Sequence, residues 1–590
     1  MPDQAEIPVP NNNNAQLHYH LVFLYGTSAG RSAFDELISL LEKHPSKILP
    51  LPRQLDQRDV ILITYGDQVQ TEHEKPLATL AKFSEKWLSE IVSTIHILPF
   101  YPYSSDDGFS VIDYTRVDPQ LGTWEDISAI GRNFRLMFDF VINHISSSSA
   151  WFRAFLQGDE KYSDYFIVVE GQPDLSRVIR PRTFPLLTAF KAQSGEKQVW
   201  TTFSEDQIDL KFSNPAVLLE MLRVLMLYIE RGAEFVRLDA IAYLWKEIGT
   251  SCIHRPQTHR IVQLLRSFLE IYAPHVRLIT ETNVPHQDNL SYFGDGTDEA
   301  QLVYNFALPP LILHTFLSGS ALPLSNWVKS LHLPSEQVTF FNFLASHDGI
   351  GITPCKGLIP DADYQALVER ILAHGGNVSY KNNPDGSRSP YELNINYFDA
   401  LSNPHSPEPL EIAVARFLAA HAIMLCLVGV PGIYFHSLVG SRSWFAGVEQ
   451  SGRYRTINRQ KLSLLQLERE LEDDNSIRSR VYSGLSMLLG IRRLHPAFAP
   501  HAEQYVLDYG DGCFALLRVS EDQGESILCL HNVRAKTVQL EMQPEQLWNF
   551  SDSRLVDLIS GQDFQGTNNL TLTLLPYQIC WIGIAKYLRK

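Results

Sequence analysis

The amino-acid sequence predicts an α/β fold: a (β/α)8 TIM barrel with an insert domain after strand three, a second insert after strand seven and a C-terminal antiparallel β domain. Two patterns predict this fold. Eight short apolar runs alternate with longer amphipathic stretches up to about residue 494, as expected of parallel strands that helices cover on both faces. After residue 494, polar and apolar residues alternate between turn dipeptides, which is typical of antiparallel strands.

The eight apolar runs are the predicted strands of the barrel. Helical patterns separate them, and the stretch 215–232 shows their usual start and stop signals, with Asn214 and Pro215 at its start and Gly232 at its end. Strand–helix units repeated eight times are the pattern of a closed barrel. The strands are predicted at residues 60–67, 93–100, 134–144, 233–243, 276–283, 300–306, 337–348 and 431–435.

A segment of different character precedes the barrel. Its first fifteen or so residues are polar, and we expect them to be disordered. The run LHYHLVFLYG (17–26) predicts a strand, and residues 32–44 predict an amphipathic helix. We group residues 1–54 as an N-terminal extension.

Two connections between predicted strands are too long to be plain loops. They follow the third and the seventh strand, and long loops in compact domains are usually functional. In barrels of this type, the loops after the strands build the active site. The chain is therefore expected to divide into three barrel segments (55–145, 214–348 and 405–494), insert domain B (146–213), a second insert (349–404) and the β domain (495–590).

Composition and charge argue against several classes of function. A chain of 590 residues is too long for a small binding module and has ample length for a large core. Its net charge is −16 and it has no run of basic residues, so we expect no nucleic-acid partner and no anionic membrane surface.

The location of the protein is expected to be cytoplasmic. The six cysteines lie far apart and form no CxxC pair, as expected of core residues in a reducing compartment. The polar N-terminus does not resemble a signal peptide. The longest apolar stretch, 413–430, is interrupted by Arg416 and His421, so it predicts a buried helix and not a membrane span.

Polar and charged side chains stand at the ends of four predicted strands. Carboxylates cost too much free energy to bury unpaired, and the carboxyl ends of barrel strands meet at one face. We therefore expect these side chains to converge on one pocket. They are Asp139, Asn143 and His144 on the third strand, Arg237 and Asp239 on the fourth, Glu281 on the fifth, and His347 and Asp348 on the seventh.

Paired carboxylates are what retaining glycoside chemistry needs: an ionised one that attacks the anomeric carbon and a protonated one that releases the leaving oxygen. Arg237 lies two residues before Asp239, on the same face of a strand, so the cation is expected to keep Asp239 ionised. The nearest cation to Glu281 in the sequence is Arg277, four residues back, which allows a raised pKa. A third carboxylate can stabilise the oxocarbenium-like transition state.

Four motifs in order, DxxxNH (139–144), RLDA (237–240), ETN (281–283) and SHDG (346–349), resemble the signature regions of the α-amylase superfamily of glycoside hydrolases. The resemblance extends over nearly the whole chain. It implies that Asp239 is the nucleophile, Glu281 the general acid/base and Asp348 the transition-state stabiliser. It also implies that three further residues position the substrate: Arg237, His144 and His347.

A finer resemblance is to the sucrose phosphorylase branch of that superfamily. The segments that carry it are 104–118, 136–149, 179–182, 346–351, 389–401 and 455–460. The resemblance implies that Asp106 pairs with Arg459 and closes the glucose subsite against longer glycans, with Arg455 as the competing cation. It implies that Phe109 and Tyr243 form an apolar platform near the anomeric carbon.

The same resemblance implies that Arg182, in the segment IRPR, meets phosphate, and that residues 349–404 are an acceptor-site insert. A plainer interpretation of Arg182 is a surface ion pair with Asp174 or Glu170. Two features depart from sucrose-specific relatives: Ile179 stands where those enzymes carry Tyr, and the stretch 375–390 differs. The glucosyl half of the substrate is thus better defined than the acceptor half.

The expected function is a retaining α-glucoside phosphorylase. It would transfer glucosyl from a small α-glucoside (glucosylglycerol, glucosylglycerate, sucrose or sucrose 6-phosphate) to inorganic phosphate, through a covalent glucosyl-enzyme, and give α-D-glucose 1-phosphate. One alternative is a hydrolase or transglucosidase, amylosucrase-like, that uses the same three carboxylates. A second alternative is a catalytically inactive binding relative.

The expected partners are a small sugar and phosphate as co-substrate, and a homodimer is one option for the oligomeric state. We expect no cofactor. We expect no metal either, since the sequence has no HxxxH motif and no cluster of His and Cys. The phosphorylases that the chain resembles also lack calcium.

Overall fold

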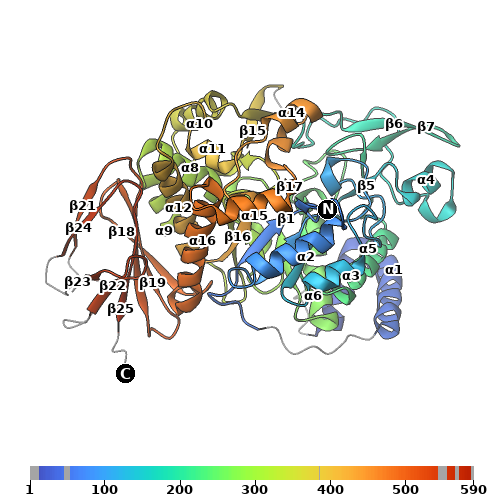
Figure 1. Ribbon diagram of the computed structural model, residues 1–590. Coiled ribbons are helices and arrows are strands. Elements are labelled where there is room, and N and C mark those ends of the chain that lie inside the picture. Colours follow the sequence, from blue (N-terminus) through green and yellow to red (C-terminus); the bar gives the residue numbers. More distant parts are fainter. Residues whose placement is uncertain (1–11, 45–52, 384–385, 543–553, 565–569, 586–590) are drawn as a thin grey trace.

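The computed structural model describes residues 12–44, 53–383, 386–542, 554–564 and 570–585 (Figure 1). Eight parallel strands close into a barrel, which confirms the predicted fold class. Each barrel strand overlaps one of the eight predicted runs. They are β1 (Ile61–Thr64), β3 (Thr94–Ile97), β4 (Arg135–Phe140), β9 (Ala233–Leu238), β10 (Arg277–Thr280), β11 (Leu302–Tyr304), β12 (Thr339–Phe343) and β16 (Val430–Tyr434).

The register between neighbouring strands brings the predicted site residues to one level. Strand β4 pairs with β9 so that Asp139 lies opposite Arg237. Strand β9 pairs with β10 so that Leu238 lies opposite Thr280. The next residue of each strand is a carboxylate, so Asp239 and Glu281 leave the barrel side by side at its carboxyl end.

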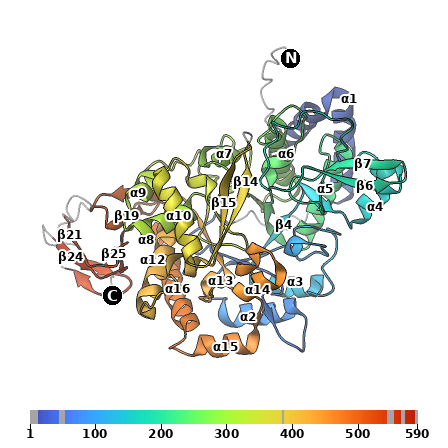
Figure 2. The ribbon, with the colours of Figure 1, turned by 90° about the horizontal axis from the view of Figure 1, so that it is seen from above.

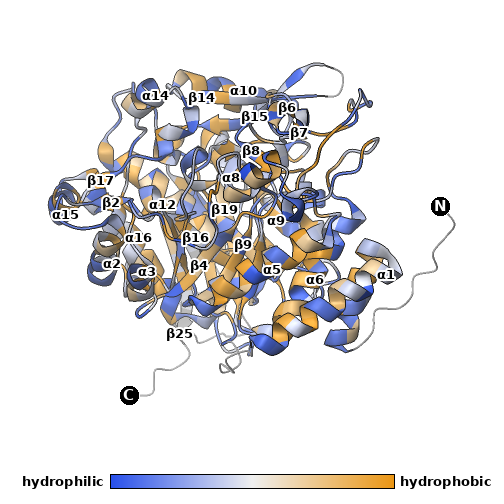
Figure 3. Ribbon diagram, turned by 90° about the vertical axis from the view of Figure 1, so that its right-hand side faces the viewer, coloured by the Kyte–Doolittle hydropathy of each residue, from blue (hydrophilic) through white to orange (hydrophobic). Residues whose placement is uncertain are grey.

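The core fills the barrel and the space between its strands and the outer helices. Side chains of the barrel strands are buried almost throughout, and Figure 3 shows hydrophobic residues concentrated there and hydrophilic residues on the outside of the molecule. The helices packed around the strands include α5 (Pro215–Glu230), α6 (Pro256–Tyr272) and α12 (Leu410–Cys426). Helix α12 contains most of the long apolar stretch, and no helix in the described part of the chain is long and apolar enough to cross a membrane.

The N-terminal extension differs from its prediction. Residues 13–43 form helix α1 (Asn13–Lys43), so the predicted strand at 17–26 is wrong, as is the predicted disorder of residues 13–15; residues 1–11 lie outside the described part. The buried residues Leu17, Leu21 and Leu24 recur with helical spacing, because this face packs on α6. The helix breaks at Gly26, whose φ of 76° suits glycine.

Both inserts stand on the same side of the barrel, at the top of Figure 1, whereas the C-terminal domain lies at one flank (Figures 1 and 2). The first insert contains β5 (His144–Ser146), α4 (Ala150–Leu156), β6 (Leu187–Ala192), β7 (Gly195–Trp200) and β8 (Gln207–Asp209). The second contains helix α10 (Asp361–Ala373) and a three-stranded sheet of β13 (Ile350–Gly351), β15 (Arg388–Asn394) and β14 (Asn377–Asn382).

The C-terminal domain is antiparallel, as predicted. Helix α16 (Ile477–Leu494) leads into a six-stranded sheet, and two further strands pair beside it. The sheet has the order β18 (Glu503–Leu507), β19 (Cys513–Val519), β20 (Ser526–Asn532), β25 (Ile579–Ala585), β22 (Arg554–Asp557) and β23 (Asp563–Phe564), and the pair is β21 (Val538–Met542) with β24 (Leu570–Leu574).

The close packing of the barrel interior at Gly432 allows us to predict the effect of one added methyl group. A Cβ at Gly432 of β16 would lie 2.2 Å from the Cζ atom of Phe341, so Gly432→Ala should overpack the core and lower stability by about 1–3 kcal/mol. Thermal unfolding measures this loss. The control is Gly490→Ala in α16. No neighbouring atom lies within 4 Å of a Cβ added there, so alanine should stabilise the helix by roughly 0.5–1 kcal/mol. Equal melting temperatures for the two variants would contradict this account of the core.

Candidate active site

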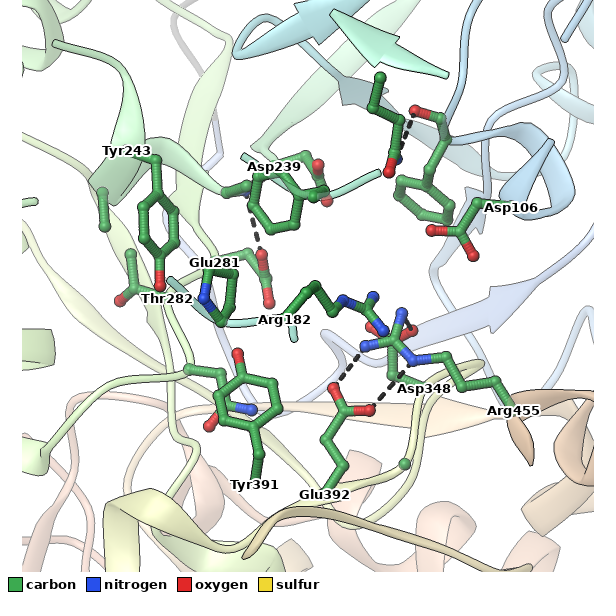
Figure 4. A pocket seen from close by; sticks show the side chains of 18 of the residues that line it. Asp106, Arg182, Asp239, Tyr243, Glu281, Thr282, Asp348, Tyr391, Glu392 and Arg455 are labelled. Atoms are coloured by element: carbon green, nitrogen blue, oxygen red, sulfur yellow. Dashed lines mark hydrogen bonds and ion pairs between the residues drawn. The ribbon is translucent and has the colours of Figure 1, made fainter. Parts of the chain in front are cut away.

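A pocket opens where the barrel strands end beneath the two inserts (Figure 4). A larger cavity of about 610 Å³ adjoins it on the outside and shares several of its walls. Arg237 and Arg459 lie behind the wall of the inner pocket and contact its carboxylates. The other nine predicted site residues line the pocket itself: Asp106, Phe109, His144, Arg182, Asp239, Tyr243, Glu281, His347 and Asp348.

One guanidinium serves three carboxylates at the floor of the pocket. The side chain of Arg237 is only 3% exposed, and its Nη1 atom lies 2.8 Å from Asp239 Oδ1. The same nitrogen contacts Asp139, and Nη2 lies 3.7 Å from Glu281 Oε2. Asp139 has a second partner, the Nε2 atom of His96 at 2.7 Å. The floor therefore holds more negative than positive charge.

The pKa of Asp239 is higher than the sequence led us to expect, because the cation beside it is shared with two other carboxylates and does not outweigh burial. Burial raises the pKa of Asp239 to about 6, and Arg237 opposes that rise without overcoming it, because the guanidinium also faces Asp139 and Glu281. Burial raises the pKa of Glu281 to about 7. The closer contact with Arg237 keeps Asp239 the more acidic of the two, so of this pair Asp239 is the carboxylate and Glu281 the group that holds a proton.

The backbone after Asp239 holds Glu281 in place. The N–H of Ala240 donates a hydrogen bond of 3.1 Å to Glu281 Oε2. To do so, Ala240 takes a left-handed conformation with φ of 50°, which costs a residue with a side chain roughly 1–2 kcal/mol. Strain of this kind is typical of functional sites.

Two arginines and a histidine surround Asp348. Its Oδ1 atom lies 2.5 Å from Arg455 Nη1 and 3.3 Å from Arg459 Nη2, and its Oδ2 atom lies 3.4 Å from His347 Nε2. Burial favours the neutral acid, but these cations prevail and hold the pKa of Asp348 well below its usual range. The ring of His347 stacks on Phe109 at 4.7 Å between centroids.

The structure brings Arg459 and Asp106 together, and it adds a second carboxylate. Arg459 Nη1 lies 3.6 Å from Asp106 Oδ1 and 2.5 Å from Asp107 Oδ2. Its Nε atom donates to the backbone oxygen of His347 at 2.9 Å. This buried arginine thus links the segment at 106–107 to the loop that carries Asp348.

The remaining predicted residues form the side of the pocket under the first insert. His144 Nε2 donates to the backbone oxygen of Phe109 at 2.9 Å, which fixes its ring. Tyr243 packs against Phe203 with a centroid distance of 5.4 Å. Phe109 also faces Arg237, whose guanidinium lies 5.6 Å from the ring centroid.

Arg182 reaches into the pocket without a partner of its own. Its predicted alternative partner Asp174 instead accepts the backbone N–H of Ser176 at 2.9 Å. No hydrogen bond or ion pair joins Arg182 to any residue in the described ranges, Asp174 and Glu170 included. Figure 4 shows its guanidinium directed away from Glu281, toward the side of the pocket where Asp348 and Arg455 lie.

Two carboxylates of the pocket region were not predicted from sequence. Asp107 is the closer partner of Arg459, and Glu392 of β15 binds Arg455 through two contacts, of which Nε to Oε2 measures 3.0 Å. The signal for Glu392 was its position, a carboxylate amid the mostly apolar and amide residues of the segment 389–401. In the described part of the chain, no group of three or more His, Cys, Asp or Glu side chains could hold a metal ion.

Comparison with known proteins agrees with this architecture. A family model described as the catalytic domain of alpha amylase matches residues 86–349, and one described as the C-terminal domain of maltogenic amylase matches residues 506–581. The chain is 48% identical over 575 residues to the glucosylglycerate phosphorylase of Spirochaeta thermophila, an alignment that covers 95% of this chain and 97% of that protein.

Two further relatives are similar over most of their length. The glucosylglycerate phosphorylase of Escherichia coli K12 is 46% identical over 561 residues, which is 95% of this chain and 98% of that protein. The crystal structure of sucrose 6F-phosphate phosphorylase from Thermoanaerobacter thermosaccharolyticum superposes with a TM-score of 0.71 at 27% identity, over 82% of this chain and 95% of that one. The chain therefore belongs to the α-amylase superfamily, in its sucrose phosphorylase-like branch.

Proposed function

We propose that this protein is a retaining phosphorylase of glucosylglycerate, which transfers the glucosyl group to inorganic phosphate and yields α-D-glucose 1-phosphate and glycerate. Relatives that carry this name are 46–48% identical along 95% of the chain. The observation in the structure that supports phosphorolysis is Arg182, a guanidinium without a counter-ion in a pocket of carboxylates. Such a cation suits an incoming oxyanion.

In the proposed first step, Asp239 attacks the anomeric carbon of the glucosyl group. A carbon–oxygen bond to the Asp239 carboxylate forms while the glycosidic bond breaks, and Glu281 gives its proton to the leaving oxygen of glycerate. The pKa order of the two groups supports these roles, because Asp239 is the more acidic. Asp348, held ionised by its arginines, would stabilise the positive charge that develops on the sugar ring.

In the proposed second step, phosphate takes the place that glycerate has left. Glu281, now ionised, accepts a proton from phosphate, whose oxygen attacks the anomeric carbon as the ester to Asp239 breaks. Two inversions at one carbon give net retention. Arg182 offsets the negative field of the carboxylates, which otherwise would repel phosphate and favour water.

The donor side of the pocket fits a single sugar ring. Arg459 closes its end with Asp106 and Asp107, and the stacked rings of Phe109 and His347 give an apolar face. A closed end of this kind excludes a continuing glycan chain. The proposed substrate is therefore a small glucoside with one glucosyl unit.

The substrate is tested by running the reaction in reverse. With α-D-glucose 1-phosphate as donor, we expect glycerate to release phosphate faster than glycerol, fructose or fructose 6-phosphate. The unpaired Arg182 favours an anion over the neutral acceptors, and the relatives that are 46–48% identical are named for glucosylglycerate. In the forward direction, glucosylglycerate should be consumed only when phosphate is present. Phosphate-independent consumption would instead identify a hydrolase or transglucosidase.

The pH profile tests the two carboxylates. The kcat/KM for the glucoside should fall below about pH 6, where Asp239 gains a proton, and above about pH 7, where Glu281 loses the one it must donate. Glu281→Gln should lower the rate roughly 10²–10⁴-fold and remove the alkaline limb, because an amide does not titrate in this range. Asp239→Asn should be inactive at every pH while its melting temperature stays near that of the wild type. An alkaline limb that persists in Glu281→Gln would assign the limb to another group.

Phosphate dependence tests Arg182. Arg182→Ala should raise the KM for phosphate roughly tenfold or more and change the KM of the glucoside far less, since one charge-assisted contact contributes about 1.5–3 kcal/mol. Hydrolysis should gain relative to phosphorolysis, as measured by the ratio of free glucose to glucose 1-phosphate. Arg177→Ala is the matched control, because this exposed arginine of the same insert only bonds the backbone oxygen of Gly249 at 3.1 Å. Equal phosphate KM values for the two variants would contradict the role of Arg182.

A further inference from the structure

A row of alternating charges, Glu392, Arg455 and Asp348, lines the side of the pocket that also carries Arg182, which we take as its acceptor side. Glu392 binds Arg455 through two contacts, and Arg455 in turn lies 2.5 Å from Asp348. Both side chains of the outer pair are largely buried, with 3% of Glu392 and 16% of Arg455 exposed. Figure 4 shows the guanidinium groups of Arg455 and Arg182 directed into the same pocket.

A glycine, Gly349, lets strand β15 of the second insert approach these charged residues closely. Strand β15 pairs with β13, which starts two residues after Asp348, and a Cβ at Gly349 would lie 3.1 Å from the Cβ of Glu392 and 3.0 Å from the backbone oxygen of Leu393. The absence of a side chain at Gly349 therefore permits the close approach of β15. As a result, a carboxylate of the insert lies within contact of a cation that also holds Asp348.

The two arginines that face the acceptor differ in their charge balance. Arg182 has no counter-ion in the described part of the chain, whereas Arg455 is neutralised by Glu392 on one side and by Asp348 on the other. An anion that enters this space meets the field of Glu392 as well as that of Arg455. The anion can bind Arg455 through two hydrogen bonds only by replacing the carboxylate of Glu392, which already binds the Nε and Nη2 atoms of that guanidinium.

We propose that Glu392 is an exchangeable counter-ion of Arg455: an oxyanion entering the acceptor side replaces it, and Glu392 returns when the anion leaves. The oxyanion is phosphate in one direction and the carboxylate of the acceptor in the other, so the inference rests on the proposed phosphorolysis. Glu392 thereby sets how tightly the pocket holds anions relative to neutral acceptors.

The exchange keeps the buried guanidinium of Arg455 compensated. Without a resident carboxylate, Arg455 would turn its second face to an empty pocket between substrates, and a buried charge that loses its partner destabilises a protein strongly. One bidentate oxyanion replaces another, so Arg455 keeps the number of its charge-assisted contacts during binding. Glu392 also competes with the product for Arg455, which weakens the hold on the departing anion.

The variant Glu392→Gln tests the proposal, because it removes the charge and keeps the shape. We expect the KM for phosphate to fall roughly three- to tenfold, since a negative charge close to the anion is gone. In the reverse reaction, the ratio of kcat/KM for glycerate to that for glycerol should rise by a similar factor. A merely structural role would change both acceptors alike and leave that ratio unmoved.

The matched control is Glu408→Gln, which removes the carboxylate from the half-buried pair of Glu408 and Arg416 outside the pocket. This variant should leave the acceptor ratio at the wild-type value. An unchanged ratio in Glu392→Gln, or a ratio that moves toward glycerol, would overturn the proposal. A wild-type enzyme that needs no phosphate would instead overturn the proposed function itself.

A second measurement needs no variant and covers the case in which Glu392→Gln fails to fold. A crystal structure of the wild-type enzyme with glucose and phosphate should show phosphate in contact with Arg455, and the Glu392 carboxylate withdrawn from the guanidinium. A structure with phosphate bound while both contacts of Glu392 with Arg455 persist would contradict the exchange.

Discussion

A single buried guanidinium, that of Arg237, determines much of the chemistry of this protein. It is the cation shared by Asp139, Asp239 and Glu281 at the barrel floor. Burial raises the pKa values of Asp239 and Glu281, and one positive charge shared by three carboxylates does not reverse that rise, so a proton is favoured within the group. The same shortage of positive charge favours a protonated Glu281 beside an ionised Asp239. One protonated and one ionised carboxyl group is the condition that two-carboxylate glycoside chemistry requires.

Around Asp348, elsewhere in the same pocket, two cations contact a single carboxylate. Asp348 is flanked by Arg455 and Arg459, so it is ionised where its neighbours on the barrel floor compete for a proton. The pocket thus separates a floor with excess negative charge from a rim that supplies cations. Arg182 and Arg455 line both the inner pocket and the larger cavity outside it, so in the proposed reaction an oxyanion would meet these two cations.

Much of the architecture could be predicted from the sequence, because barrel strands are short apolar runs and their ends carry residues that a core would exclude. All eight strands were found in this way. The strand predicted at 17–26 is wrong because its apolar residues recur with helical spacing and form a face that packs on α5 and α6. Asp107 was missed because adjacent aspartates differ only in the direction that the local backbone gives them. Glu392 was missed because the local sequence marks it only as an unusual carboxylate, whereas its contact with Arg455 depends on the pairing of β15 with β13.

The close approach of β15 at Gly349 has a consequence for how this superfamily diversifies. One side of the pocket comes mainly from the ends of the barrel strands, whereas the inserts contribute residues of the opposite side, among them Arg182 and Glu392. Such inserts can lengthen, shorten or change composition during evolution without disturbing the strands beneath them. A change in these inserts would therefore reshape one wall of the pocket while the carboxylates at the strand ends keep their places.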